Sequence, residues 1–97
     1  MGKYICLWEA DESKIPIDPA ERKVGWQMAT AMVREDFNKG LTKDYGVFLG
    51  QPNGFTIVEG TEEEVTNMTL QYMPFFRFKV IPIISLDKVE AAINAMP

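Results

Sequence analysis

Apolar residues form short uninterrupted runs near both ends of the chain. Residues 3–9 (Lys-Tyr-Ile-Cys-Leu-Trp-Glu) make a run of strand length with aromatic and β-branched side chains, which predicts a first strand covered on both faces. Residues 75–84 (Phe-Phe-Arg-Phe-Lys-Val-Ile-Pro-Ile-Ile) send alternate side chains to opposite sides and predict the last strand. Because Pro82 has no amide proton to give to a neighbouring strand, this strand should lie at an edge of the sheet.

Two more strands are predicted at mid-chain, over residues 45–50 and 54–59. Both segments are rich in aromatic and β-branched residues, and Pro52, Asn53 and Gly54 stand where they meet. Asn and Gly are the residues that best tolerate positive φ, as tight hairpin turns require. We therefore predict a hairpin closed by a Pro-Asn-Gly turn, with residues 54–59 inside the sheet and residues 45–50 at an edge.

The helical segments are marked by capping signals. Asp18-Pro19-Ala20-Glu21 supplies an N-cap, a proline at the first helical position and a glutamate placed for a reciprocal cap. The helix should run to about Asn38 and end at Gly40. Its predicted buried face is an arc made of Met28, Ala29, Met32 and Val33, flanked by Trp26 and Phe37.

Thr61-Glu62-Glu63-Glu64 predicts a capping box that begins a second long helix, with Val65, Met68 and Tyr72 on its buried side. The three glutamates suit the positive end of the helix dipole. A metal cluster is the alternative, but consecutive helical residues fan out around the axis and converge poorly on one ion. We expect no metal site here.

A third, short helix is predicted at the end of the sequence. Ser85 provides its cap, and the helix should continue through Met96 with Leu86, Val89 and Ile93 on one side.

The order of elements is strand, helix, strand, strand, helix, strand and a terminal helix. Ninety-seven residues suffice for one domain, spanning residues 1–97. Right-handed crossovers favour an α+β, ferredoxin-like βαββαβ fold with an antiparallel sheet in the order 4-1-3-2 and both long helices on one face. The sequence leaves open which face of the sheet meets the helices.

The predicted strands are apolar on both faces instead of alternating between apolar and polar. Ile5 and Leu7 alternate with Tyr4, Cys6 and Trp8, and the hairpin strands behave in the same way. A large apolar surface left bare on a sheet is typical of an interface or a ligand cleft. We therefore predict a homodimer in which two open sheet faces pack together with isologous contacts.

Two segments carry a resemblance to a known group of proteins. Gly54-Phe-Thr-Ile-Val-Glu59 and Pro74-Phe-Phe-x-Phe-x-Val-x-Pro82-Ile resemble the dimeric α/β-barrel superfamily, and within it a family of small bacterial and archaeal proteins of unknown function. The pattern covers residues 45–84, and the element order covers the whole chain. The resemblance implies a dimeric α/β barrel, but it transfers no catalytic residue because the family has none assigned.

Better-known members of this superfamily include cofactor-independent monooxygenases, muconolactone isomerase-like enzymes, heme-dependent chlorite dismutases, dye-decolourising peroxidases and small-ligand regulatory domains. The heme proteins use a proximal histidine, and another branch uses a histidine and aspartate pair. This chain contains no histidine. The resemblance therefore points away from both groups, and we expect no cofactor.

The amino-acid composition reduces the kinds of partner that the protein is expected to bind. Ten Lys and Arg stand against 14 Asp and Glu, which gives a formal charge of −4, the wrong sign for a general binder of nucleic acid. One cysteine, Cys6, leaves no intramolecular disulfide to form. With no long apolar segment and no signal-like run, we expect a soluble, cytoplasmic protein without a membrane partner.

Candidate ligand-binding residues are the aromatic and charged side chains of the strands: Tyr4, Trp8, Glu9, Tyr45, Glu59 and Arg77. In the predicted sheet, Glu9 at the end of the first strand approaches Arg77 at the start of the last, and Glu59 lies near Lys3 and Tyr4. An exposed ion pair at a strand end, contributing roughly 0–1 kcal/mol, is the simpler interpretation of each charge.

Two functions fit these features. The first is a dimer that binds a small apolar or aromatic metabolite in a cleft with aromatic walls. The second is a cofactor-independent enzyme, monooxygenase- or isomerase-like, in which Glu9 or Glu59 acts as the base and Arg77 orients the substrate.

Overall fold

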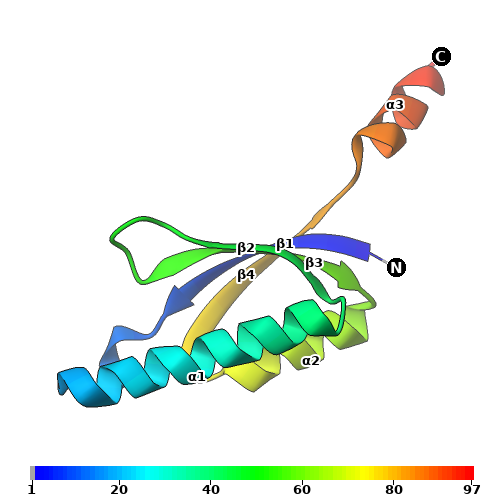
Figure 1. Cartoon of the computed structure of the whole chain (residues 1–97). Coiled ribbons are helices and arrows are strands. Elements are labelled where there is room, and N and C mark those ends of the chain that lie inside the picture. Colours follow the sequence, from blue (N-terminus) through cyan, green and yellow to red (C-terminus); the bar gives the residue numbers. More distant parts are fainter. Residues whose placement is uncertain (1) are drawn as a thin grey trace.

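A four-stranded antiparallel sheet in the order β2-β3-β1-β4 forms the framework of the protein (Figure 1). The structure is a computed structural model that describes residues 2–97. Its strands are β1 (Gly2–Ala10), β2 (Thr42–Val47), β3 (Asn53–Gly60) and β4 (Phe76–Ile83). This order is the predicted 4-1-3-2 order viewed from the opposite edge. β3 lies inside the sheet, and β2 and β4 form its edges, as predicted.

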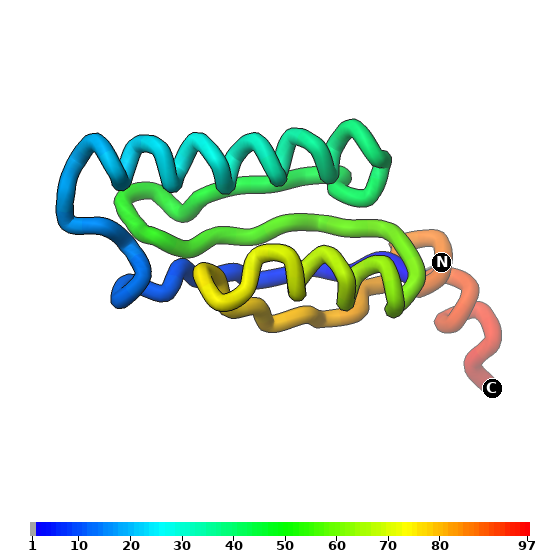
Figure 2. Tube along the Cα trace, turned by 90° about the horizontal axis from the view of Figure 1, so that it is seen from below, coloured from blue at the N-terminus to red at the C-terminus, as the bar shows by residue number. Residues whose placement is uncertain are grey.

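Two long helices lie on one face of the sheet: α1 (Pro19–Asn38) and α2 (Glu62–Tyr72). Figure 2 shows α1 running along the β2 side while α2 runs nearer β1 and β4. Both begin at the predicted caps. The Asp18 carboxylate accepts a hydrogen bond from the Glu21 amide at 3.1 Å. Thr61 and Glu64 form the full capping box, with bonds of 3.0 and 3.1 Å. The chain leaves α1 through Gly40, whose φ is +78°.

The predicted position of the hairpin turn is wrong. β2 ends at Val47, and Asn53 and Gly54 already belong to β3. The loop is closed by hydrogen bonds from the Phe48 amide to the Asn53 carbonyl (2.9 Å) and from the Gln51 amide to the Phe48 carbonyl (3.0 Å). Gly50, with φ +74°, supplies the left-handed residue that the turn needs.

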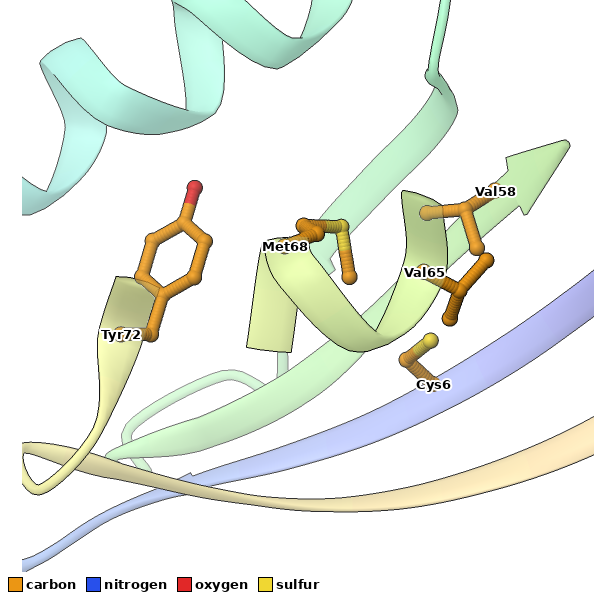
Figure 3. Packing of buried hydrophobic residues seen from close by; sticks show 5 residues of the cluster. All are labelled: Cys6, Val58, Val65, Met68 and Tyr72. Carbon is orange, nitrogen blue, oxygen red and sulfur yellow. The ribbon is translucent and has the colours of Figure 1, made fainter. Parts of the chain in front are cut away.

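The hydrophobic core lies between the sheet and α2. Its buried members are Cys6, Val58, Val65, Met68 and Tyr72 (Figure 3). The buried side of α2 is therefore the predicted one. The predicted face of α1 is found only in part: Met32 and Val33 pack against the core, but Met28 is largely exposed, and the one fully buried residue of α1 is Asp36. α1 thus lies loosely on the sheet and leaves space beneath it.

No helix or strand within residues 2–97 packs on the face of the sheet opposite α1 and α2 (Figure 1). We call it the open face, and its central residues are Ile5, Leu7, Phe55, Ile57 and Ile81, which are neighbours in the strand register. In one chain β1 is therefore covered by helices on one face only, and the predicted cover of its other face would have to come from a second copy.

Residues 84–97 form an arm that leaves the body of the protein at the end of β4. The arm carries α3 (Leu86–Asn94), which stands beyond the end of the sheet (Figure 1). The Cα radius of gyration is 16.0 Å, whereas a compact domain of this length measures about 12–13 Å. Among residues 2–97, no helix combines the length and apolar character needed to cross a membrane.

Candidate functional site

The space beneath α1 is a pocket with aromatic walls. Its inner part, which we call the inner cavity, has a volume of about 40 Å³ and lies between α1, α2 and the helix-covered face of the sheet. Its aromatic lining residues are Trp8, Trp26, Tyr45, Tyr72, Phe76 and Phe78. A cavity needs at least roughly 10–15 Å³ of such volume to hold one water, so there is room for ordered water or for a few atoms of a ligand.

A larger space, the outer pocket, adjoins the inner cavity at the end of β1 and the start of β4. Its volume is about 320 Å³, near the lower limit of about 300–1,000 Å³ for pockets that bind small molecules. Both spaces are lined by Trp26, Ala29, Tyr72 and Phe76. We treat the two spaces together as the aromatic pocket.

Trp8, which lines the inner cavity, is held firmly by its neighbours. Its indole Nε1 donates a hydrogen bond to the Phe55 carbonyl at 3.3 Å. Its ring stacks on Tyr45 at 5.7 Å with an interplanar angle of 5°, and meets the edge of Phe76 at 5.7 Å. A Cβ at residue 54 would lie 2.7 Å from the Trp8 indole and would also meet the Gly46 carbonyl oxygen. Gly54 is therefore needed for Trp8 to lie flat against β3.

A buried hydrogen bond joins α1 to α2 at the inner end of the pocket. Tyr72 Oη donates to Asp36 Oδ2 at 2.7 Å, and both residues are buried. Burial raises the pKa of the Asp36 carboxyl, although the bond from Tyr72 opposes this. Burial, followed by the bond to Asp36, raises the pKa of Tyr72. Tyr72 thus remains a neutral donor at physiological pH, and Asp36 holds a proton more readily than an exposed aspartate.

Hydroxyl groups supply further polar atoms of the inner cavity. Burial raises the pKa of Tyr45, so this phenol is also neutral. Thr56 Oγ1 donates to the Asp44 carbonyl at 2.9 Å, which leaves its oxygen lone pairs as acceptors. Around these groups the walls are apolar, so the inner cavity offers a few fixed polar atoms in an aromatic surround.

Charged residues stand at the mouth of the outer pocket. Lys14, Arg22 and Asp11 are among its lining residues. Hydrogen bonds from the Ser13 hydroxyl and amide lower the pKa of Asp11 and keep it ionised. The mouth therefore carries two cations and one anion, and the apolar lining lies behind them.

The predicted site residues fall on both faces of the sheet. Trp8 and Tyr45 line the inner cavity, and Tyr4 lies on the same face, packed against the core. Glu9 and Arg77 lie on the open face, because they alternate along their strands with residues of the helix-covered face. They stand directly opposite each other on the neighbouring strands β1 and β4. Glu59 pairs with Lys3 in the same manner. The six residues therefore do not form one site.

The predicted charge pairs are present. Arg77 Nη2 lies 3.5 Å from Glu9 Oε1. Glu59 lies 3.8 Å from both Lys3 Nζ and Lys43 Nζ. These side chains are substantially exposed, so each pair contributes roughly 0–1 kcal/mol. Glu59 also borders a polar cavity of about 250 Å³ between the end of α1 and the start of α2.

Asp36 is the site residue that sequence reasoning missed. It follows Met32 by four residues and Val33 by three, so it lies on the half-buried stripe of α1. A carboxylate at an apolar position of a helix was the signal that could have identified it. Its partner Tyr72 was predicted to be buried, but no pairing was predicted between the two helices.

A scan against models of known protein families gives no match to this chain, and a search of curated proteins gives none either. The fold itself, a small α+β domain with a four-stranded antiparallel sheet, is compatible with a ferredoxin-like arrangement.

Proposed function

We propose that the protein binds a small apolar or aromatic molecule in the aromatic pocket. The observation that supports this most is that a 320 Å³ apolar pocket adjoins an inner cavity whose lining includes the hydrogen-bonded pair Asp36 and Tyr72. Pockets that bind small molecules are typically apolar with a few fixed polar groups, which is the arrangement found here.

The polar atoms suggest how such a molecule would be oriented. Because the Tyr72 hydroxyl already donates its hydrogen bond to Asp36, the oxygens of this pair are available to a ligand mainly as hydrogen-bond acceptors. The Thr56 hydroxyl proton is likewise committed to the Asp44 carbonyl. The ligand that fits best presents a hydroxyl or N–H donor at the inner end and places its ring against Trp8 and Tyr45.

Binding is favoured over the alternative of an enzyme built on a glutamate and an arginine. That mechanism needs both charged groups at the aromatic walls. Glu9 and Arg77 pair with each other at 3.5 Å, and neither is among the residues that line the aromatic pocket.

The test uses the two tryptophans of the chain as reporters. Trp8 and Trp26, the only tryptophans, both line the inner cavity. A panel of phenols, anilines and their naphthalene analogues should include a compound that quenches tryptophan fluorescence saturably and raises the melting temperature.

Gly25→Phe is the matched variant that blocks the pocket. Gly25 lines the outer pocket on the same helical stripe as Met28, Ala29 and Met32. A Cβ there meets nothing within 4 Å, so the variant should fold while its ring fills the pocket. Saturable quenching that is equal in wild type and Gly25→Phe would contradict the proposed site.

We further propose that the chain forms a homodimer through the open face. The apolar residues Ile5, Leu7, Phe55, Ile57 and Ile81 form a continuous centre on that face. Charged pairs flank it, with Lys3 and Glu59 at one end of the strands and Glu9 and Arg77 at the other. An apolar centre with a polar rim is the usual composition of a protein interface.

A further inference from the structure

α3 has an apolar side that no other part of the described chain covers. Leu86, Val89 and Ile93 recur at helical spacing, and their exposed fractions are 71%, 37% and 57%. Ser85 caps the helix, accepting a bond from the Lys88 amide at 3.4 Å. A helix of nine residues is marginal in water by itself. α3 therefore needs a surface to pack against.

The surface in this chain that matches α3 best is the mouth of the outer pocket. Trp26, Met28 and Phe75 line that pocket with exposed fractions of 38%, 66% and 55%. Lys14, Arg22 and Asp11 also line it and leave an excess of one positive charge, whereas Asp87, Lys88 and Glu90 leave α3 an excess of one negative charge. The apolar stripe and the excess charge of α3 thus both complement the mouth.

The apolar side of α3, which begins at Leu86, cannot lie along the pocket of its own chain. The outer pocket lies beside Phe76 at the start of β4. Because a strand rises about 3.3 Å per residue, Ile83 at the end of β4 is about 23 Å from Phe76. Three residue steps from Ile83 allow Leu86 to lie at most about 11 Å away. Figure 1 shows α3 beyond the opposite end of the sheet, on the side away from α1 and α2.

We propose that α3 of each copy packs over the mouth of the outer pocket of a second copy, so that the partner supplies the outer wall of the ligand site. This inference rests on the homodimer proposed above. A second copy on the open face would lie on the side of the sheet where α3 stands (Figure 1). A two-fold axis across the strands brings opposite ends of the two sheets together, and so places each arm at the end of the sheet where the other copy's outer pocket lies.

The size of the open face supports an exchange of arms. The flat outline of a face four strands wide and eight residues long measures about 19 by 26 Å, or about 500 Å², somewhat less than its accessible surface. Stable interfaces bury about 800 Å² from each partner. The arm supplies the additional surface, and it also closes a pocket that is otherwise open to solvent.

Disulfide trapping between two variants tests the proposal. Val89→Cys and Met28→Cys are purified separately, mixed and oxidised mildly near pH 8. The native Cys6 is buried, and burial raises the pKa of its thiol to about 11, so it does not compete. Ala91→Cys is the control for Val89→Cys, because residue 91 lies on the opposite side of α3.

We expect a covalent heterodimer from the Val89→Cys and Met28→Cys mixture, at several times the yield of the Ala91→Cys control. Light scattering on the unoxidised samples measures whether the chain is a dimer, and so distinguishes a failure of the arm exchange from a failure of the dimer. A dimer that gives no cross-link above the control overturns the exchange of arms and leaves the open-face dimer standing. A monomer overturns both.

A triple variant, Leu86→Ser with Val89→Ser and Ile93→Ser, provides a second test of the proposal. These side chains lie outside the hydrophobic core, so the body should fold, as circular dichroism can verify. The dimer dissociation constant should rise about a hundredfold. An unchanged constant overturns the proposal.

Discussion

The hydrogen bond from Tyr72 to Asp36 is the most informative single contact in the protein. It joins residues 36 positions apart, on two helices, at a distance of 2.7 Å. Tyr72→Phe removes the donor and leaves a buried carboxyl without its partner, which should lower the free energy of unfolding by about 1–3 kcal/mol. Urea unfolding measures this loss. Tyr4→Phe, on the same face of the sheet, is the control and should change stability by less than about 0.5 kcal/mol.

Asp36 also gives stability a characteristic dependence on pH. Because folding raises the pKa of Asp36, the folded state holds this proton more tightly than the unfolded state. The corresponding stability is present below the unfolded pKa, about 3.9, and is lost as pH rises through the raised folded value. Relative to wild type, Asp36→Asn should therefore become more stable as pH increases from about 4 toward neutrality. A difference that stays constant with pH, in urea unfolding, would contradict this assignment.

At the scale of elements, alanine substitutions at two glycines on either side of the pocket should change the stability of the protein in opposite directions. Gly25 is inside α1 with open space around it, so Gly25→Ala should stabilise the protein by about 0.5–1 kcal/mol. Gly54→Ala meets the Trp8 indole and the Gly46 carbonyl. It should destabilise by more than about 2 kcal/mol and alter tryptophan fluorescence. Thermal unfolding measures both, and equal effects would show that Trp8 is not fixed by β3.

The elements also show why the sequence predicted the fold better than the site. Caps at Asp18 and Thr61 are local signals, and both helices begin there. The hairpin turn was misplaced because Asn53-Gly54 resembles a turn, whereas the glycine is required by Trp8, which pairs with it across the sheet. The pocket depends on how far α1 stands from the sheet, and no local pattern encodes that distance. The pairing of Asp36 with Tyr72 depends on the same tertiary geometry.

For the whole molecule, the open face predicts the state of assembly. Light scattering at micromolar concentration should give twice the mass of one chain. Ile57→Lys places a charge at the centre of the open face, and should yield a monomer because an unpaired charge is costly to bury. Val24→Lys makes the same change at an exposed position on α1 and should leave the dimer intact. A dimer that tolerates Ile57→Lys would require a different interface.

The ligand site is tested most directly by methionine methyl NMR. Met28 and Met32 line the outer pocket and Met68 lines the inner cavity, whereas Met73 lines neither. With ¹³C-methyl methionine in the full chain and the best compound from the phenol and aniline panel, the signals of Met28, Met32 and Met68 should shift saturably, with a common dissociation constant. The Met73 signal should stay in place. Saturable binding that shifts Met73 and leaves the three pocket methionines unmoved would contradict a ligand site beneath α1.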